Sequence, residues 1–301
     1  IGRGGFGKVW KVEQRKQRKL FAMKEMAKAR IISKRSVNSV MNEKKFLAQL
    51  ATRKTHPLLN QLIYRFLVNM HYAFECRENL YLVIDLMSGG DLRYHIGKYR
   101  RFTEEQTSTS PVPSNLPTEF FVACMLLCLE YLHKNCILHR DIKLDNILLD
   151  GKGRVKIADF GVSKHVKPND VMHEQSGTPA YIAPEILREK GYTGFKADIW
   201  SAGVVLYAML FGTVPFKASN MKELHKMIIK GKYTLKEEIS PEAKHLMRSM
   251  METDPDKRIS INKILAHPWI TSAGTDLDIF NEEEKEIVKK EFIYNNPKVN
   301  N

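Results

Sequence analysis

Two polar motifs that stand close together constrain this sequence more than any other feature. Residues 139–146 (HRDIKLDN) fit the pattern H-R-D-x-x-x-x-N over its full length, and residues 159–161 (DFG) begin thirteen residues after Asn146. Asp141 in the first motif is a carboxylate that can accept a proton from a hydroxyl group. Asn146 and Asp159 supply oxygen atoms of the kind that Mg²⁺ prefers. Both motifs in this order are rare by chance and indicate a site for a magnesium-bound nucleotide.

A glycine-rich segment opens the chain. Gly2, Gly4, Gly7 and Val9 fit the pattern G-x-G-x-x-G-x-V. Glycine has no Cβ, so the backbone N–H groups of such a loop can approach phosphates closely. A dinucleotide-binding fold would need a helix directly after the glycines, whereas residues 8–11 continue as a strand. The pattern therefore argues against that fold, and taken alone it is equally compatible with a plain glycine turn.

A lysine and a glutamate follow on predicted regular elements. Lys24 ends the apolar run FAMK at residues 21–24, which resembles the pattern V-A-I-K on a strand. Residues 37–50 have the periodicity of an amphipathic helix and carry Glu43, which could pair with Lys24. Each residue also has a plain alternative, as a surface lysine or as a carboxylate on a solvated helix face.

Further along, the chain has helical and hairpin signals. Residues 120–132 and 197–210 are long apolar runs that predict buried helices. Residues 147–149 and 155–157 flank a turn with the sequence DGKG, which predicts a β-hairpin.

Residues 183–185 (APE) add one more motif. Taken in order from Gly2 to about Trp269, these motifs resemble those of the eukaryotic serine/threonine protein kinase domain. The subgroup signals are mixed, with features similar to the AGC and to the calmodulin-dependent kinases. The resemblance implies an α+β, bilobal fold. We expect a small β-rich N-lobe with one main helix at residues 1–87, its first strand truncated, and a mostly helical C-lobe at 88–270. Residues 271–301 are expected to be a C-terminal extension with an amphipathic helix.

The resemblance also implies roles for individual residues, with ATP and Mg²⁺ as cofactors. Asp141 would be the catalytic base, Lys143 would contact the transferred phosphate, and Lys24 would hold phosphates while it pairs with Glu43. Asn146 and Asp159 would bind Mg²⁺. The residues expected to line the ATP site are Ile1, Gly2, Gly4, Gly7, Val9, Ala22, Lys24, Ile84, Asp85, Met87 and Leu148.

The same resemblance implies contacts that support the site. Asp198 would hold the loop at residues 139–146, and Arg258 would pair with Glu185. Four side chains would stack between the lobes as a regulatory spine: Leu47, Met70, His139 and Phe160.

Two further features concern the substrate and the activity switch. Lys143 together with Thr178 resembles serine/threonine kinases rather than tyrosine kinases. In the family an arginine at the position of Arg140 receives a phosphothreonine, but this chain has Glu174 at the matching position. A carboxylate there could pair with Arg140 without phosphorylation, although with about one negative charge instead of nearly two.

Two acidic residues predict a substrate preference. Asp91 and Asp145 match positions that, in basophilic relatives, hold an arginine three residues before the phosphoacceptor, and two carboxylates suit a guanidinium. A third acidic position of those relatives is Ala208 here. Asp91 could instead be a helix N-cap.

The composition argues against a nucleic-acid-binding or membrane-spanning protein. The net charge is +14, and residues 1–54 hold 16 Lys and Arg against three Asp and Glu. Because no nucleic-acid motif accompanies this charge, we expect a solvated face that attracts a nucleotide rather than direct nucleic-acid binding. No apolar stretch approaches the roughly 18 residues of a membrane span. Four cysteines without a C-x-x-C pair suggest free thiols and an intracellular, cytoplasmic protein.

The expected activity is transfer of phosphate from ATP to Ser or Thr of protein substrates, and the oligomeric state is left open. The alternative is a pseudokinase scaffold that binds nucleotide and partners without turnover. The sequence departs from the pattern in two apparent insertions, at 52–65 and 108–118, and residues 66–70 are expected to resume the strand after the first insertion. The chain also begins at Ile1 without Met, as a fragment would.

Overall fold

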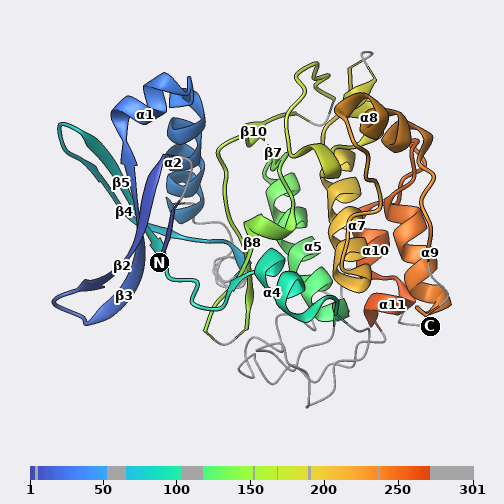
Figure 1. Cartoon of the computed structure of the whole chain (residues 1–301), viewed down its shortest axis with the longest axis horizontal. Helices are drawn as coiled ribbons and strands as arrows, with labels where there is room; N and C mark the ends of the chain where they lie inside the picture. Colours follow the sequence, from blue (N-terminus) through green and yellow to red (C-terminus); the bar gives the residue numbers. More distant parts are fainter. Residues whose placement is uncertain are drawn as a thin grey trace.

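The structure, a computed structural model, describes residues 1–3, 6–52, 66–102, 118–151, 153–167, 169–188, 191–235 and 238–271. A small sheet-based part and a larger helical part lie side by side (Figure 1). The chain passes from one to the other after β5 (Asn79–Asp85). The predicted α+β, bilobal architecture is confirmed.

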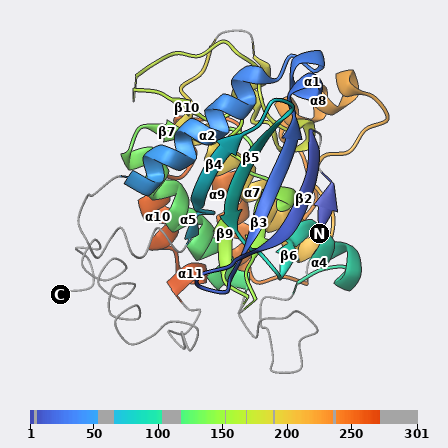
Figure 2. The same cartoon turned by 90° about the vertical axis from the view of Figure 1, so that its left-hand side faces the viewer.

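The smaller part is one antiparallel sheet with the strand order β1-β2-β3-β5-β4. Its other strands are β1 (Gly2–Arg3), β2 (Gly7–Gln14), β3 (Lys19–Ala27) and β4 (Met70–Glu75). The helices α1 (Lys28–Ser33) and α2 (Val37–Thr52) follow β3, and α2 lies alongside β4 (Figure 2). The amphipathic helix predicted at residues 37–50 is therefore present, and its Phe46 and Leu47 are buried.

Gly7 has a packing role that the sequence pattern did not reveal. It pairs with Met26 on β3, and a Cβ added to it would lie 1.9 Å from the carbonyl oxygen of Glu25. Any larger residue would push β2 away from β3. The close approach that this glycine permits is thus to a neighbouring strand, in addition to the phosphate contact expected from the motif.

The larger part is built around two long helices, α5 (Thr118–Lys134) and α7 (Phe195–Phe211), which pack on one another. α7 is buried on all sides over residues 197–210, as a helix in the centre of a domain should be, and Trp200 on it is fully buried. It ends at Gly212, whose φ of 71° is the left-handed conformation that favours glycine. Both predicted buried helices, at 120–132 and 197–210, are present.

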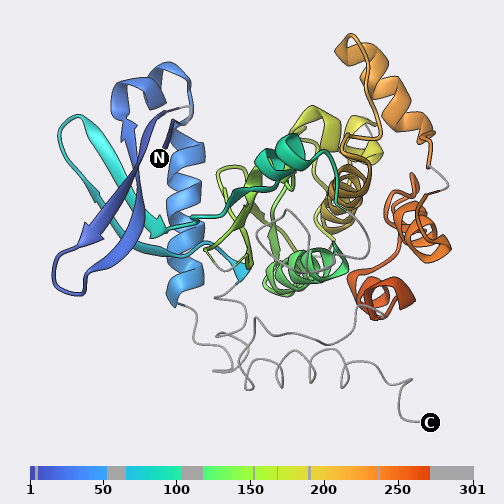
Figure 3. The ribbon, with the colours of Figure 1, turned by 60° about the horizontal axis from the view of Figure 1, so that its bottom comes forward.

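Shorter helices surround this pair. α4 (Leu92–Tyr99) lies beside the junction of the two parts, and the last three helices, with α8, lie at the end away from the sheet (Figure 3). The short helices are α6 (Pro184–Leu187), α8 (Met221–Lys230), α9 (Pro241–Met250), α10 (Ile261–Leu265) and α11 (Pro268–Thr271).

Small strands and turns frame the loops between the parts. β6 (Gly90–Asp91), β8 (Ile147–Leu149) and β9 (Val155–Ile157) form one small sheet, and β8 and β9 are the predicted hairpin. β7 (Ile137–Leu138) pairs with β10 (Lys164–His165). Two 3₁₀ turns complete this region, η1 (Leu144–Asn146) and η2 (Pro179–Tyr181).

The strand predicted at residues 66–70 is largely wrong, because β4 begins only at Met70. The preceding residues are directed to the other part of the molecule: Leu67 forms an isolated parallel bridge with Ile157, and Val68 N–H donates to the carbonyl of Ile157 at 3.0 Å. Leu67 and Val68 are therefore bound to β9, whereas Asn69 bonds to Asp85 at the end of β5.

Several expectations fall outside the described residues. These are Gly4, most of both apparent insertions, and residues 272–301 of the expected extension. At the edges of the insertions, Thr52 ends α2 and Thr118 begins α5, so Thr118 is helical rather than part of a loop.

The cysteines are free thiols, as expected. Cys124 and Cys128 are buried on α5, and their pKa values are raised well above that of an ordinary thiol by burial. Among the residues that the structure describes, no helix combines the length and the apolar character needed to cross a bilayer.

A buried ion pair ties the last helices to the centre of the larger part. Arg258 Nη1 and Nη2 lie 2.6 and 2.8 Å from the two carboxylate oxygens of Glu185, and both side chains are almost fully buried. The guanidinium also donates to the carbonyls of Glu252 and Lys196 and lies over the ring of Trp200. The predicted Arg258–Glu185 pair is therefore present, with its buried charges well provided with hydrogen bonds.

We expect the substitution Arg258→Met to lower the free energy of unfolding by about 3–5 kcal/mol, because it leaves the Glu185 carboxylate buried without its partner. Urea denaturation followed by tryptophan fluorescence measures the change. The matched control is Lys257→Met, which removes a neighbouring cation that is 78% exposed and pairs with Asp254 at 3.6 Å. The control is expected to cost less than about 1 kcal/mol, and equal losses in the two variants would contradict the prediction.

Candidate active site

Asp141 is the centre of the site. Its Oδ2 accepts hydrogen bonds from Lys143 Nζ at 2.6 Å and Asn146 Nδ2 at 3.1 Å, and its Oδ1 accepts from Thr178 Oγ1 at 2.7 Å. Burial alone would raise the pKa of Asp141, but the bonds from Lys143 and Thr178 outweigh it, so the pKa lies below its ordinary value. The carboxylate is therefore ionised at neutral pH and can accept a proton.

The loop that carries Asp141 is held by a second, fully buried carboxylate. Asp198 accepts from the backbone N–H of His139 at 3.0 Å and of Arg140 at 2.9 Å, and His133 Nε2 lies 2.8 Å from its Oδ2. Burial raises the pKa of Asp198, but His133 and the other bonds more than compensate, and the pKa is lowered. The predicted support by Asp198 is thus present, and His133 on α5 is a partner that the motifs did not indicate.

Lys24 and Glu43 form the predicted ion pair between β3 and α2. Burial lowers the pKa of Lys24. The negative charges of Glu43 and Asp159 together raise it by more than burial lowers it, so the pKa lies above its ordinary value. The influence of Asp159 shows that the carboxylate before Phe160 lies near this pair. The three charged groups from separate parts of the sequence therefore converge on one side of the site.

Asp159 and Phe160 occupy a constrained turn. Asp159 has a φ of 66°, a conformation that is costly for a residue with a side chain and that concentrates at functional sites. A Cβ on Gly161 would lie 2.6 Å from Ser39 Oγ on α2. Phe160 is buried with its ring centroid 5.2 Å from that of His139. The turn is therefore fixed between α2 and the loop at residues 139–146.

The donor set at Asn146 and Asp159 fits a magnesium ion. Asn146 donates its amide N–H to Asp141, which directs the amide oxygen elsewhere, while Oδ1 of Asp159 accepts from Gly161 N–H. In the described part of the chain no group of three or more His, Cys, Asp or Glu forms a metal cluster. Mg²⁺ commonly uses one or two protein oxygens with phosphate and water, so this sparse set suits it.

The expected nucleotide wall is formed by facing strands. Val9 pairs with Lys24 across β2 and β3, and Ala22 pairs with Ile84 across β3 and β5. Ala22 and Ile84 are buried, and the partly buried side chains of Val9, Leu148 and Met87 pack against the core. Gly2 on β1 pairs with Val9, and the N-terminal amine of Ile1 donates to the carbonyl of Val9.

The Asp85 side chain, by contrast, is directed into a polar cluster of its own. It accepts from Lys156 Nζ at 2.7 Å and Asn69 Nδ2 at 2.8 Å, and His71 Nε2 lies 2.7 Å away. Burial raises the pKa of Asp85, but the bond to His71 and the charge of Lys156 outweigh this effect and hold the pKa well below its ordinary range. Its backbone N–H donates to the carbonyl of Asn69. Sequence motifs gave no signal for this cluster.

Glu174 pairs with Arg140, as the sequence predicts. Glu174 Oε2 lies 3.1 Å from Arg140 Nη1, and Oε1 lies 3.2 Å from Lys164 Nζ. The bonds from Lys164 and Arg140 lower the pKa of Glu174, which is 63% exposed. Tyr192 OH donates to the backbone carbonyl of Glu174. The segment after the DFG motif is therefore attached to the catalytic loop without any added phosphate.

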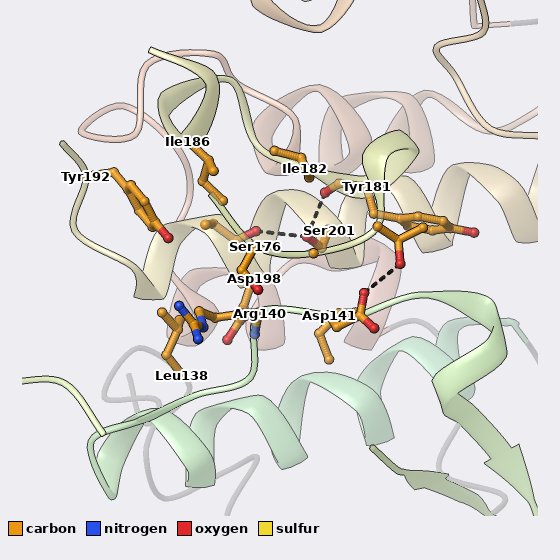
Figure 4. Close-up of a pocket in the computed structure, with 14 residues that line it drawn as sticks. Leu138, Arg140, Asp141, Ser176, Tyr181, Ile182, Ile186, Tyr192, Asp198 and Ser201 are labelled. Carbon is orange, nitrogen blue, oxygen red and sulfur yellow. Dashed lines mark hydrogen bonds between the residues drawn. The ribbon is translucent and has the colours of Figure 1, made fainter. Parts of the chain in front are cut away.

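The same segment packs closely against the catalytic loop (Figure 4). Asp141 and Arg140 come from the loop, Tyr181 and Ile182 from the facing segment, and Ser201 from α7 behind them. Ser201 Oγ donates to the carbonyl of Tyr181 at 2.8 Å, which fixes this segment on α7. Lys143 Nζ also donates to Thr178 Oγ1 at 2.9 Å.

The two acidic residues expected to bind substrate both have partners within the chain. Asp91 is the N-cap of α4, where Oδ1 accepts from Tyr94 N–H at 2.7 Å. Asp145 receives the guanidinium of Arg93. The N-cap alternative for Asp91 is therefore present in the structure, and Arg93 is a residue at the site that the sequence motifs did not reveal.

Comparison with known proteins bears on this geometry. The family model described as "Protein kinase domain" matches residues 1–270. "Protein kinase 2" of Dictyostelium discoideum is 37% identical over 272 residues, which cover 89% of this chain and 52% of that protein. The "RAC family serine/threonine-protein kinase homolog" of the same organism is 34% identical over 90% of this chain and 56% of its own length.

"Atypical protein kinase C" of Drosophila melanogaster is 33% identical over 92% of this chain and 45% of its own length. The chain thus spans about half the length of the curated relatives it matches. Because the family model covers most of the chain and these relatives share more than 30% identity with it, the chain belongs to the protein kinase domain family.

Proposed function

We propose that this chain transfers the terminal phosphate of ATP to serine or threonine hydroxyl groups of protein substrates. The observation that carries the proposal is the set of bonds around Asp141, which leaves an ionised carboxylate beside Lys143 and Thr178. A pseudokinase would need a missing catalytic group, whereas Lys24, Asp141, Asn146 and Asp159 are all present.

The proposed mechanism assigns a task to each group. Asp141 orients the substrate hydroxyl and accepts its proton as the oxygen bonds to phosphorus and the bond from phosphorus to the ADP oxygen breaks. Lys143 neutralises charge on the transferred phosphoryl group, and Lys24, positioned by Glu43, binds the other phosphates. Asn146 and Asp159 would hold magnesium, which neutralises phosphate charge when it is bound.

The proposal also covers the division of the chain into domains. We infer that residues 1–87 and 88–270 act as the two lobes around the nucleotide, since Val9 and Ala22 lie on the sheet of the first part and Leu148 lies on β8 of the second. Residues 271–301 are proposed to be an extension of the second lobe. Free cysteines support a reducing, intracellular compartment.

We expect Asp141→Asn to lower kcat for peptide phosphorylation by about 10²–10⁴-fold, because the amide cannot accept the hydroxyl proton. Transfer of labelled phosphate from ATP to a serine peptide measures it. Asp159→Asn is expected to lose activity as well and to need more magnesium. The matched control is Asp256→Asn, an exposed residue of the helical part, which should retain wild-type activity. Full activity of Asp141→Asn would refute the proposed base.

We further propose that Glu174 gives the chain activity without phosphorylation of this position. The support is its pair of ionic contacts, with Arg140 next to the catalytic Asp141 and with Lys164 on β10. Because these cations lower the pKa of Glu174, its charge and the pairing persist at neutral pH. Both are lost only as the pH falls below the ordinary range of a carboxylate.

We expect Glu174→Gln to lower basal kcat/KM about two- to fivefold, the effect of losing an ion pair whose carboxylate is exposed to solvent. The difference should shrink at high ionic strength, which screens exposed charges. The control is Glu13→Gln, which removes a surface pair between Glu13 on β2 and Arg18, whose side chains are 39% and 81% exposed. An unchanged basal rate in Glu174→Gln would contradict the proposal.

Finally, we propose that the preferred substrates carry an arginine three residues before the phosphoacceptor, bound by Asp145 with help from Asp91. The support is the half-exposed Asp145 carboxylate one residue before Asn146. A positional peptide library should show arginine enriched at that position in the wild type and not in Asp145→Asn, and a flat profile in the wild type would contradict the preference.

A further inference from the structure

Arg93 and Asp145 form a geometrically specific pair on the surface beside the active site. Arg93 Nε lies 2.8 Å from each of the two Asp145 oxygens, and Arg93 Nη2 donates to Tyr181 OH at 3.2 Å. Arg93 lies in the first turn of α4, Asp145 in η1 and Tyr181 in η2. One guanidinium thus joins three segments that are distant in the sequence.

Both partners of Arg93 adjoin groups that bind the proposed base. Asn146, the neighbour of Asp145, donates to Asp141, and Thr178, three residues before Tyr181, also donates to Asp141. The surface that carries Arg93 is therefore close to Asp141, where the proposed function places the substrate hydroxyl. Arg93 presents a cation at the same place where the proposed function requires an anion.

The pair competes directly with a substrate arginine. A guanidinium binds a carboxylate best through two parallel N–H···O bonds, and the Nε–H of Arg93 already lies between the two oxygens of Asp145 that such an arginine would need. The guanidinium is always charged in a folded protein, and the bond to Asp145 raises the pKa of Arg93 further. Asp91 offers a weaker alternative, because one of its oxygens caps α4.

The pair is nevertheless exchangeable. The side chains of Arg93 and Asp145 are 52% and 43% exposed, and exposed ion pairs contribute little net stability. An incoming arginine can therefore displace Arg93, at the cost of this modest interaction. The consequence is a preference that is present but weakened.

We propose that Arg93 is a specificity-determining residue that occupies the Asp145 carboxylate in place of the substrate's arginine and so reduces selection for it. This inference rests on the proposed function. A purely structural role, in which the pair only attaches α4 to η1, would predict loss of stability or of overall activity without a change in selectivity.

The test compares two peptides that differ only three residues before the serine, one with arginine and one with citrulline, its neutral isostere. The measured quantity is the ratio of their kcat/KM values. We expect Arg93→Met to raise this ratio about two- to fivefold, through a lower KM for the arginine peptide. Asp145→Asn should bring the ratio close to one, and the double variant should match Asp145→Asn.

The matched control is Lys98→Met on the same helix, where the lysine lies over Tyr99 and should leave the ratio unchanged. Arg93→Lys keeps the charge but loses the planar guanidinium that joins Asp145 and Tyr181, and it should give an intermediate ratio. Thermal melting of each variant establishes that it is folded.

The possible results distinguish a failure of the inference about Arg93 from a failure of the proposed kinase activity. An unchanged ratio in Arg93→Met, with activity retained on the citrulline peptide or lowered equally on both, would overturn the inference and leave the kinase activity standing. Failure of the wild type to phosphorylate either peptide would refute the proposed function and, with it, the inference.

Discussion

The active site depends on one buried carboxylate, Asp198, and the backbone that it holds. A buried charge is tolerated only when it is fully hydrogen-bonded, and Asp198 obtains its bonds from His133 and from two consecutive backbone N–H groups, those of His139 and Arg140. These bonds stabilise the loop at Arg140, whose φ of 70° is unfavourable for a residue with a side chain. Asp141 follows directly, so its position is set by a contact deep in the helical part.

Polar contacts also join the two parts of the molecule. Lys156 on β9 binds Asp85 at the end of β5, and Asn42 on α2 donates to the carbonyl of Ser163 at 2.7 Å. The Lys24–Glu43 pair then depends on where α2 lies. Because these bonds are directional, they fix the orientation of the sheet and α2 relative to the catalytic loop more narrowly than apolar packing does.

The sequence predicted what is local and missed what is assembled from distant segments. The helix with Glu43, the hairpin at residues 147–157 and the Asp141 loop all follow from patterns within short windows. No short pattern marks His133, Lys156 or Arg93, because each of them binds a carboxylate that is 52 to 71 residues away in the chain. The strand expected at 66–70 failed for the same reason, since hydrogen bonds to Ile157 compete with strand pairing there.

Two features outside the catalytic motifs share one physical logic. At Arg140, Glu174 supplies a negative charge that a phosphate would otherwise bring, and at Asp145, Arg93 supplies a positive charge that a substrate would otherwise bring. Glu174 has about one negative charge where a phosphate would have nearly two, and the Arg93 pair is half exposed, so neither internal partner is held tightly. An internal partner neutralises part of the charge before a phosphate or a substrate arginine is present, so adding the external group changes the charge balance of the site less. The proposed enzyme therefore has a higher basal activity, and it discriminates less sharply among substrates, than an enzyme in which these charged residues have no internal partner.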